Sequence, residues 1–116
     1  SLIKEADRVF SIAVRQRYSN EHGIVKCSTC HLTMHWTEIT CGHFRKRRHM
    51  KTRWDIKNAA PQCSFCNGKD LDVKYFLIDK FSKEEIEEVE ALSHKNANFT
   101  EQELKEIILK YSKQIK

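Results

Sequence analysis

Residues 27–67 read CSTCHLTMHWTEITCGHFRKRRHMKTRWDIKNAAPQCSFCN. This segment opens with one Cys-x-x-Cys motif, Cys27 to Cys30, and ends just after a second, Cys63 to Cys66. Two such motifs provide the four thiolates that a tetrahedral zinc ion needs. The interval between them is longer than in a compact zinc ribbon. We therefore expect these four cysteines to bind a structural zinc ion that clamps a loop with a function of its own.

Length and composition limit the class of protein. The 116 residues suffice for one domain. No apolar run approaches the roughly 18 residues of a membrane span, and the chain does not open on a signal peptide. Five cysteines without a secretory signal favour a reducing compartment and a metal over disulfides or free core thiols. We expect a cytoplasmic protein without membrane contact, with the fifth cysteine, Cys41, in its core.

Positive charge is concentrated in one part of the chain. The net charge is +5, yet residues 82–116 hold six Lys and eight Glu, a net charge of −2. Against the single acid Asp55, residues 43–57 hold seven basic residues, namely Arg45, Lys46, Arg47, Arg48, Lys51, Arg53 and Lys57. A local patch of this kind is typical of proteins that bind a phosphate backbone. We expect these seven side chains to contact DNA, the alternative being a merely solvated loop.

Hydrophobic periodicity predicts the order of the elements. Apolar residues at helical spacing predict a helix over residues 2–17. The Thr-, Trp- and Ile-rich residues 32–44 predict a β-hairpin that presents His43 at the end of its second strand. Residues 45–57 are expected to form an irregular, exposed loop. A helix is predicted over residues 71–81.

Two further helices are predicted from capping signatures. Ser82 with Glu85 opens one, and Thr100 with Glu103 opens the other. The elements together predict an α+β fold in a single domain over residues 1–116. It would comprise an N-terminal helical part (1–23), a zinc-braced core (24–70) and a helical extension (71–116).

The segment between the cysteine motifs also carries groups suited to phosphodiester hydrolysis. That reaction needs a base for water, a divalent cation for the phosphate, and cationic donors. Neutral imidazole is the usual base near pH 7, and a carboxamide oxygen can bind a hard cation such as Mg²⁺. His43, Asn58 and Asn67 supply these groups. A single His or Asn is structural far more often than catalytic. The hypothesis therefore rests on the order of these three residues relative to the two cysteine motifs.

That order, Cys-x2-Cys, Gly-His, Asn and Cys-x2-Cys-Asn, resembles the HNH or His-Me finger (ββα-metal) nucleases. Within that superfamily the chain is similar, over nearly its whole length, to the NinG (Rap) family of phage recombination proteins. The stretches that carry the similarity are Arg8–Ser11, Arg15–Arg17, Cys27–Cys30, Gly42–Phe44, Arg53–Asn58 and Gln62–Gly68.

The resemblance implies a fold, an activity and a set of roles. It implies a ββα-metal core and metal-dependent cleavage of branched or single-stranded DNA recombination intermediates such as Holliday junctions, in the host cytoplasm. It implies His43 as general base, Asn67 as a ligand of a catalytic Mg²⁺ or Mn²⁺, and Asn58 as a positioning residue. An Asn in place of the commoner third His is similar to recombination endonuclease VII. Symmetric cutting of a four-way junction would favour a homodimer.

One position departs from the superfamily pattern. Many relatives carry, directly before the His, an Asp that serves as second metal ligand, and here that residue is Gly42. Glu38, His49 and Asp55 are the candidates to replace it. The missing acid favours a rival hypothesis, a non-catalytic, zinc-stabilised nucleic-acid-binding module. A third hypothesis is a zinc-stabilised domain whose acidic C-terminal helices bind a protein. His31 and His35 are expected at the surface of the hairpin.

Overall fold

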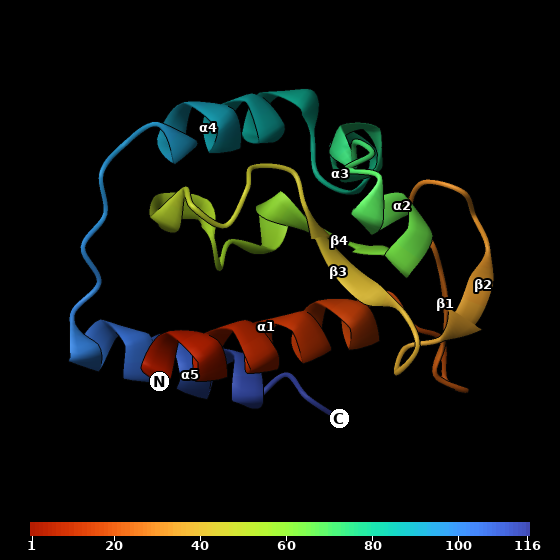
Figure 1. Ribbon diagram of the computed structural model, residues 1–116, viewed down its shortest axis with the longest axis horizontal. Helices are drawn as coiled ribbons and strands as arrows, with labels where there is room; N and C mark the ends of the chain where they lie inside the picture. The colour runs from red at the N-terminus through yellow and green to blue at the C-terminus, as the bar shows by residue number, and fades with distance from the viewer.

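The N-terminal segment is helical because its apolar side chains recur on one face. In the computed structural model, which describes residues 1–116, helix α1 spans Leu2–Arg17, as predicted. The Ser1 hydroxyl caps it by accepting a hydrogen bond from the Lys4 N–H at 3.3 Å. Its apolar side packs against helix α5 (Glu101–Ser112), and the two helices lie side by side in Figure 1. The side chains buried on that side of α1 are Ala6, Val9, Phe10, Ala13 and Val14.

Four short strands form two separate antiparallel sheets of two strands each. Strand β1 (Ile24–Lys26) pairs with β2 (Thr33–His35), and β3 (Thr40–His43) pairs with β4 (Ala59–Gln62). The predicted hairpin within residues 32–44 is therefore wrong, because its two strands belong to different sheets. The expectation that His43 ends a strand is confirmed, and its partner in the β3–β4 register is Ala59.

The turn at the first cysteine motif explains this pairing. The Cys27 N–H donates to the Leu32 carbonyl at 2.8 Å, and His31 takes the left-handed backbone conformation with φ of 68°. The chain thus folds back on β1 directly after the motif, so β2 is paired before β3 begins. Strand β4 escapes prediction because its sequence, Ala-Ala-Pro-Gln, has weak strand propensity. All four of its residues are nevertheless buried.

The segment between β3 and β4 is irregular, as predicted. The prediction that residues 45–57 are exposed is wrong for Thr52 and Trp54, which are buried because the terminal helices pack against the loop. It contains two short 3₁₀ turns, η1 (Met50–Thr52) and η2 (Ile56–Asn58). The indole N–H of the buried Trp54 donates to the Asp7 carboxylate of α1 at 3.0 Å. From α5, the Tyr111 hydroxyl donates to the Trp54 carbonyl at 2.6 Å. Both terminal helices therefore fix the loop around Trp54.

The remaining helices are α2 (Ser64–Gly68), α3 (Lys74–Lys80) and α4 (Lys83–Ser93). The helix predicted over residues 71–81 begins only at Lys74, because the Asp72 side chain accepts the Lys74 N–H at 2.9 Å and ends the preceding loop. Both capping predictions are confirmed. The Ser82 hydroxyl accepts the Glu85 N–H, and Thr100 forms a full capping box with Glu103.

The β3–β4 sheet and the loop lie between two helical layers. Figure 1 shows α1 and α5 on one side and α3 and α4 on the other. The buried side chains form three clusters: one between α1 and α5, one around the cysteines, and one between β4, α3 and α4. None of the helices has the length and apolar character that a membrane crossing requires.

Candidate functional site

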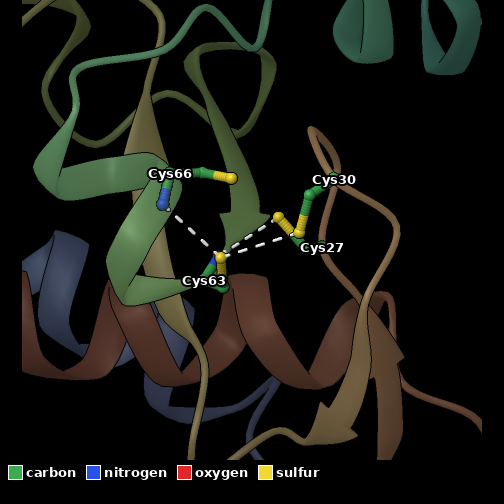
Figure 2. A group of neighbouring side chains, drawn as sticks. All are labelled: Cys27, Cys30, Cys63 and Cys66. Atoms are coloured by element: carbon green, nitrogen blue, oxygen red, sulfur yellow. Dashed lines mark hydrogen bonds between the residues drawn. The ribbon is translucent and has the colours of Figure 1, made fainter.

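The four paired cysteines meet at one point of the core. Cys27 and Cys30 come from the turn between β1 and β2, whereas Cys63 caps α2 and Cys66 lies within it. Their four sulfur atoms lie within 4.8 Å of one another, and Figure 2 shows the side chains converging. The Cys30 and Cys63 sulfurs are 3.8 Å apart. A tetrahedral ion with Zn–S bonds of about 2.3 Å spaces its sulfurs by about 3.8 Å, so the cluster can hold a metal ion.

Backbone donors surround this cluster. The N–H groups of Thr29 and Cys63 donate to the Cys27 sulfur at 3.4 and 3.3 Å. Burial alone would raise the pKa of the Cys27 thiol, but the backbone donors outweigh burial and lower that pKa to about 6. Metal binding requires the thiolate, which Cys27 forms readily. Burial and the neighbouring thiols instead raise the pKa of Cys66 to about 12, so a bound cation would have to displace the Cys66 proton. Cys41 lies outside the cluster, and burial raises its pKa to about 12.

A polar cleft of about 540 Å³ lies next to the cysteine cluster. Helix α1 supplies one wall, along which Asp7, Ser11 and Arg15 follow one another at helical spacing. His43 at the end of β3 and Asn67 on α2 also line the cleft. The structure thus brings together two of the three residues predicted to be catalytic. Asn58 is not among the lining residues.

The His43 ring is held in a defined protonation state. Its Nε2 lies 3.1 Å from the Arg53 carbonyl oxygen. A carbonyl can only accept, so Nε2 carries the proton and Nδ1 is left with a free electron pair. Burial lowers the pKa of His43 below its ordinary value; the bond to the Arg53 carbonyl opposes this shift, and the charge of Arg47 adds to it. The imidazole is therefore neutral near pH 7.

Asn67 is fixed by the cysteine cluster and by β3. It directly follows Cys66, and its Nδ2 donates to the Thr40 hydroxyl at 3.0 Å. The Thr40 hydroxyl in turn donates to the Gln62 carbonyl at 2.5 Å. These bonds set the orientation of the amide and leave the Asn67 Oδ1 without a hydrogen-bond partner. That oxygen is available to a cation.

Asn58 holds the loop rather than the imidazole itself. Its buried side chain accepts the Arg45 N–H at 2.7 Å and donates to the carbonyls of Arg45 and Thr52, each at 3.0 Å. The Phe44 N–H also donates to the Asn58 carbonyl at 2.8 Å. Asn58 makes no hydrogen bond to His43. Any positioning of His43 by Asn58 is therefore indirect, through the backbone that follows β3.

None of the three candidates for a second cation ligand lines the cleft. Glu38 is exposed in the turn before β3, His49 bonds the Ser93 carbonyl at 3.1 Å, and Asp55 caps η2. The acids that do line the cleft are Asp7 and Asp70. Asp7 could not be found from the sequence, because only the fold brings α1 to β3. Asp70 could have been found from the sequence, because it lies only three residues after Asn67.

Asp7 and Asp70 differ in the oxygens that they leave free. Both oxygens of Asp7 accept hydrogen bonds from Arg53, at 3.0 and 2.6 Å, and one also accepts from Trp54. Asp70 is exposed, and only its Oδ2 is engaged, by the Lys46 amine at 2.6 Å. Asp70 is thus the acid of the cleft with a free oxygen.

Gly42 lies close to the side chain of Gln62. A Cβ atom on Gly42 would collide with the side chain of Gln62, which lies across the strand pair. That Gln62 side chain is buried and donates to the Thr29 hydroxyl and the Leu71 carbonyl, each at 3.0 Å. Gln62 therefore ties the two cysteine motifs together, and a larger residue at position 42 would require its side chain to shift and to give up these bonds.

Comparison with protein families supplies the remaining observation. The model of the family described as Bacteriophage Lambda NinG protein matches residues 1–116. The chain belongs to the NinG family. The predicted resemblance to that phage family is therefore confirmed. No curated protein matches the chain, and no solved structure does.

Five of the seven cationic side chains that are predicted to bind DNA in this NinG family member form ion pairs within the fold. Arg48 and Lys51 are exposed and form no ion pair. Arg53 is the most enclosed of the paired residues, with its side chain 16% exposed, so its pair with Asp7 stabilises the fold and leaves the side chain little access to DNA. The five ion pairs are Arg45 with Glu90, Lys46 with Asp70, Arg47 with Asp7, Arg53 with Asp7, and Lys57 with Glu85.

The hydrogen bonds that Asp7 accepts from Arg53 and Trp54 should stabilise the fold in a pH-dependent way. Burial alone would raise the pKa of Asp7, but the hydrogen bonds and charge of Arg53 outweigh it and lower the pKa below its ordinary value. Asp7→Asn is expected to lower the free energy of unfolding at pH 7 by about 2–3 kcal/mol, the worth of a charge-assisted hydrogen-bonded pair. Urea denaturation of the wild type and the variant measures this difference.

The pH dependence provides the internal check on that prediction. A carboxylate with a depressed pKa stabilises the fold fully above its unfolded pKa, and this contribution is lost as the pH falls through the folded pKa. The difference between wild type and Asp7→Asn should therefore shrink below about pH 4. Glu5→Gln, which removes an exposed acid paired with Arg8, should change stability little at either pH. A difference that persists unchanged in acid would contradict the assignment.

Proposed function

We propose that this NinG family protein is a metal-dependent, structure-specific DNA endonuclease with an HNH-like core, acting on branched or single-stranded recombination intermediates. The observation that carries the proposal is that His43 and Asn67 line one polar cleft. Strands β3 and β4 and helix α2 follow one another as strand, strand and helix. His43 ends the first strand and Asn67 lies on the helix, which is the arrangement expected of a ββα-metal core.

His43 would act as the general base through Nδ1, because its Nε2 proton is engaged by the Arg53 carbonyl. The neutral imidazole takes a proton from a water molecule, whose oxygen attacks the phosphorus as the bond to the leaving oxygen breaks. The lowered pKa of His43 keeps the ring in the basic form at neutral pH. Arg53 supports this role through its backbone, while its side chain is committed to Asp7.

Two kinds of metal would serve different purposes. The four cysteines would hold a structural Zn²⁺, which sets the position of Asn67 because that residue follows Cys66. Asn67 and Asp70 would hold a catalytic Mg²⁺ or Mn²⁺, since both offer a free oxygen at the cleft and such cations prefer oxygen ligands. When bound, that ion would polarise the phosphate and stabilise the leaving oxygen.

Cleavage of defined DNA substrates tests this function. Zinc-loaded protein should nick four-way junctions and single strands when Mg²⁺ or Mn²⁺ is added, and should leave them intact without added divalent ions. A linear duplex serves as the control for structure specificity. If the protein binds these substrates yet cuts none of them with either ion, the non-catalytic nucleic-acid-binding module is the better function.

The exposed cations of the loop should control affinity for DNA rather than cleavage chemistry. Replacing Arg48 and Lys51 with Gln should weaken binding equally across sequences, because these exposed, unpaired side chains would contact phosphates and not bases. The slope of log K against log salt should fall by about 1.8, since each phosphate contact to a duplex contributes about 0.9. Fluorescence anisotropy at several salt concentrations measures the slope.

Lys105→Gln, on the exposed side of α5, is the matched control and should leave the slope unchanged. A loss of binding confined to one DNA sequence would instead indicate base recognition by the loop.

A further inference from the structure

Arg15 is unusual among the arginines of the chain. It is partly buried in α1 and lines the cleft, yet it forms no ion pair. The other arginines that are not exposed, Arg45 and Arg53, each have a carboxylate partner. A partly buried charge without a counter-ion is unfavourable unless something else compensates it. The structure therefore leaves one positive charge at the cleft without its complement.

No acid of the chain forms an ion pair with Arg15. Asp7 lies on the same helix, about 12 Å away along the axis at 1.5 Å per residue, and both its oxygens are engaged by Arg53. Asp70 has one free oxygen, but it pairs with Lys46 through the other oxygen and not with Arg15. The ionisable group that acts most on Arg15 is Cys41, whose thiol stays neutral at pH 7 because burial raises its pKa to about 12.

The guanidinium of Arg15 is also pinned in place. Its Nε donates to the Ser11 hydroxyl and the Ser11 carbonyl, both at 3.1 Å, and its Nη1 donates to the Trp36 carbonyl at 3.0 Å. The group also lies over the Trp36 ring, 5.4 Å from the ring centroid. Only Nη2 has no acceptor. A rigid donor with a free N–H edge at a polar cleft is arranged to bind an anion without further ordering.

We propose that Arg15 binds a nonbridging phosphate oxygen of the nucleic acid in the cleft, through Nη2. The proposal rests on the proposed function for the identity of the anion as a DNA phosphate. The phosphate would lie in the same cleft as His43 and Asn67, and its negative charge would supply the missing complement of Arg15. Arg15 would thereby hold the scissile phosphate and stabilise the charge that grows on it during attack.

A titration with inorganic phosphate, followed by NMR on zinc-loaded wild-type protein without catalytic cations, tests the site directly. Phosphate should shift the Arg15 Nε–H signal and the amide signals of Thr40 and His43 in a saturable way. Chloride at equal ionic strength should not. Saturable shifts confined to other parts of the chain, or no shifts at all, would overturn the proposal without any need for a variant.

Substitution then separates anion binding from a structural role. Arg15→Gln should weaken phosphate binding at the cleft by at least about tenfold, and Arg15→Lys should restore it only in part, because an ammonium cannot keep the pinned planar geometry. Arg17→Gln, an exposed arginine on the same helix without an ion pair, should bind phosphate like the wild type. Unchanged phosphate affinity in folded Arg15→Gln would refute the proposal.

A single-stranded oligonucleotide, used in place of phosphate, relates the site to DNA. Its binding without divalent ions should fall in Arg15→Gln and remain in Arg17→Gln. Because neither probe requires cleavage, this inference and the nuclease proposal fail independently. A protein that binds phosphate through Arg15 but cuts no DNA refutes the enzyme alone, whereas active cleavage with unchanged binding in Arg15→Gln refutes the role of Arg15 alone.

Discussion

His43→Ala is expected to reduce cleavage of branched or single-stranded DNA by about 10²- to 10⁴-fold, the contribution typical of a general base. The reason is that no other imidazole lines the cleft. Affinity for the same substrates should stay close to that of the wild type, because His43 is neutral and the phosphate-binding cations remain. Single-turnover cleavage and anisotropy binding, measured on the same preparation, separate the two effects.

The matched control is His35→Ala, which removes a histidine whose ring hydrogen-bonds only to Thr37 and lies outside the cleft. It should cleave like the wild type. The pH profile adds a second test. Since burial places the pKa of His43 below 6.5, the cleavage rate should hold down to below that pH and then fall as the ring is protonated. A His43→Ala variant that cuts at the wild-type rate would remove His43 from the mechanism.

Removal of the proposed metal site at the four cysteines is the second change with a large expected effect. The double substitution of Cys27 and Cys66 by Ser should abolish tight zinc binding and unfold the core around β1, β3 and α2. Structural zinc in small domains is worth about 10–16 kcal/mol at pH 7, which exceeds the whole stability of most domains of this size. Elemental analysis should find about one zinc per wild-type chain, and circular dichroism should show the lost thermal transition.

Cys41→Ser is the control for removing a thiol. Cys41 lies outside the sulfur cluster, so this variant should retain both the zinc and the transition. If the double variant keeps its metal and melts like the wild type, the four cysteines are not a structural metal site. Asn67 would then lack the constraint that the mechanism assigns to it.

Local signals in the sequence predicted those elements that depend on local physics. The helix over residues 2–17 is confirmed because its apolar spacing and its end signals lie within the segment itself. The caps at Ser82 and Thr100 are confirmed for the same reason, since each involves residues three positions apart. The approach of the four sulfurs was also predictable, because two Cys-x-x-Cys turns have few ways to place four thiols.

The errors concern interactions between distant segments. The hairpin over residues 32–44 was wrong because strand propensity does not specify a partner, and the turn at Cys27–Cys30 pairs β2 with β1 first. Sequence also overestimated the free charge of the basic loop. The partners Glu85 and Glu90 lie on α4 and Asp7 lies on α1, so their neutralising effect is visible only in the folded chain. The arrangement of Arg15 against Trp36 was hidden for the same reason.

The two hydrogen bonds that hold the loop at Trp54, one to Asp7 and one from Tyr111, can form only in a set order during synthesis. Tyr111 reaches the Trp54 carbonyl across 57 residues of sequence. Chains leave the ribosome N-terminus first, so α1, the cysteine cluster and the loop emerge well before α5. Until α5 docks, this loop lacks the bond from Tyr111 and is held by its contacts with α1 and α4. A nascent chain would therefore form the contacts of this loop with α1 and α4 before the Tyr111 bond that fixes the Trp54 carbonyl.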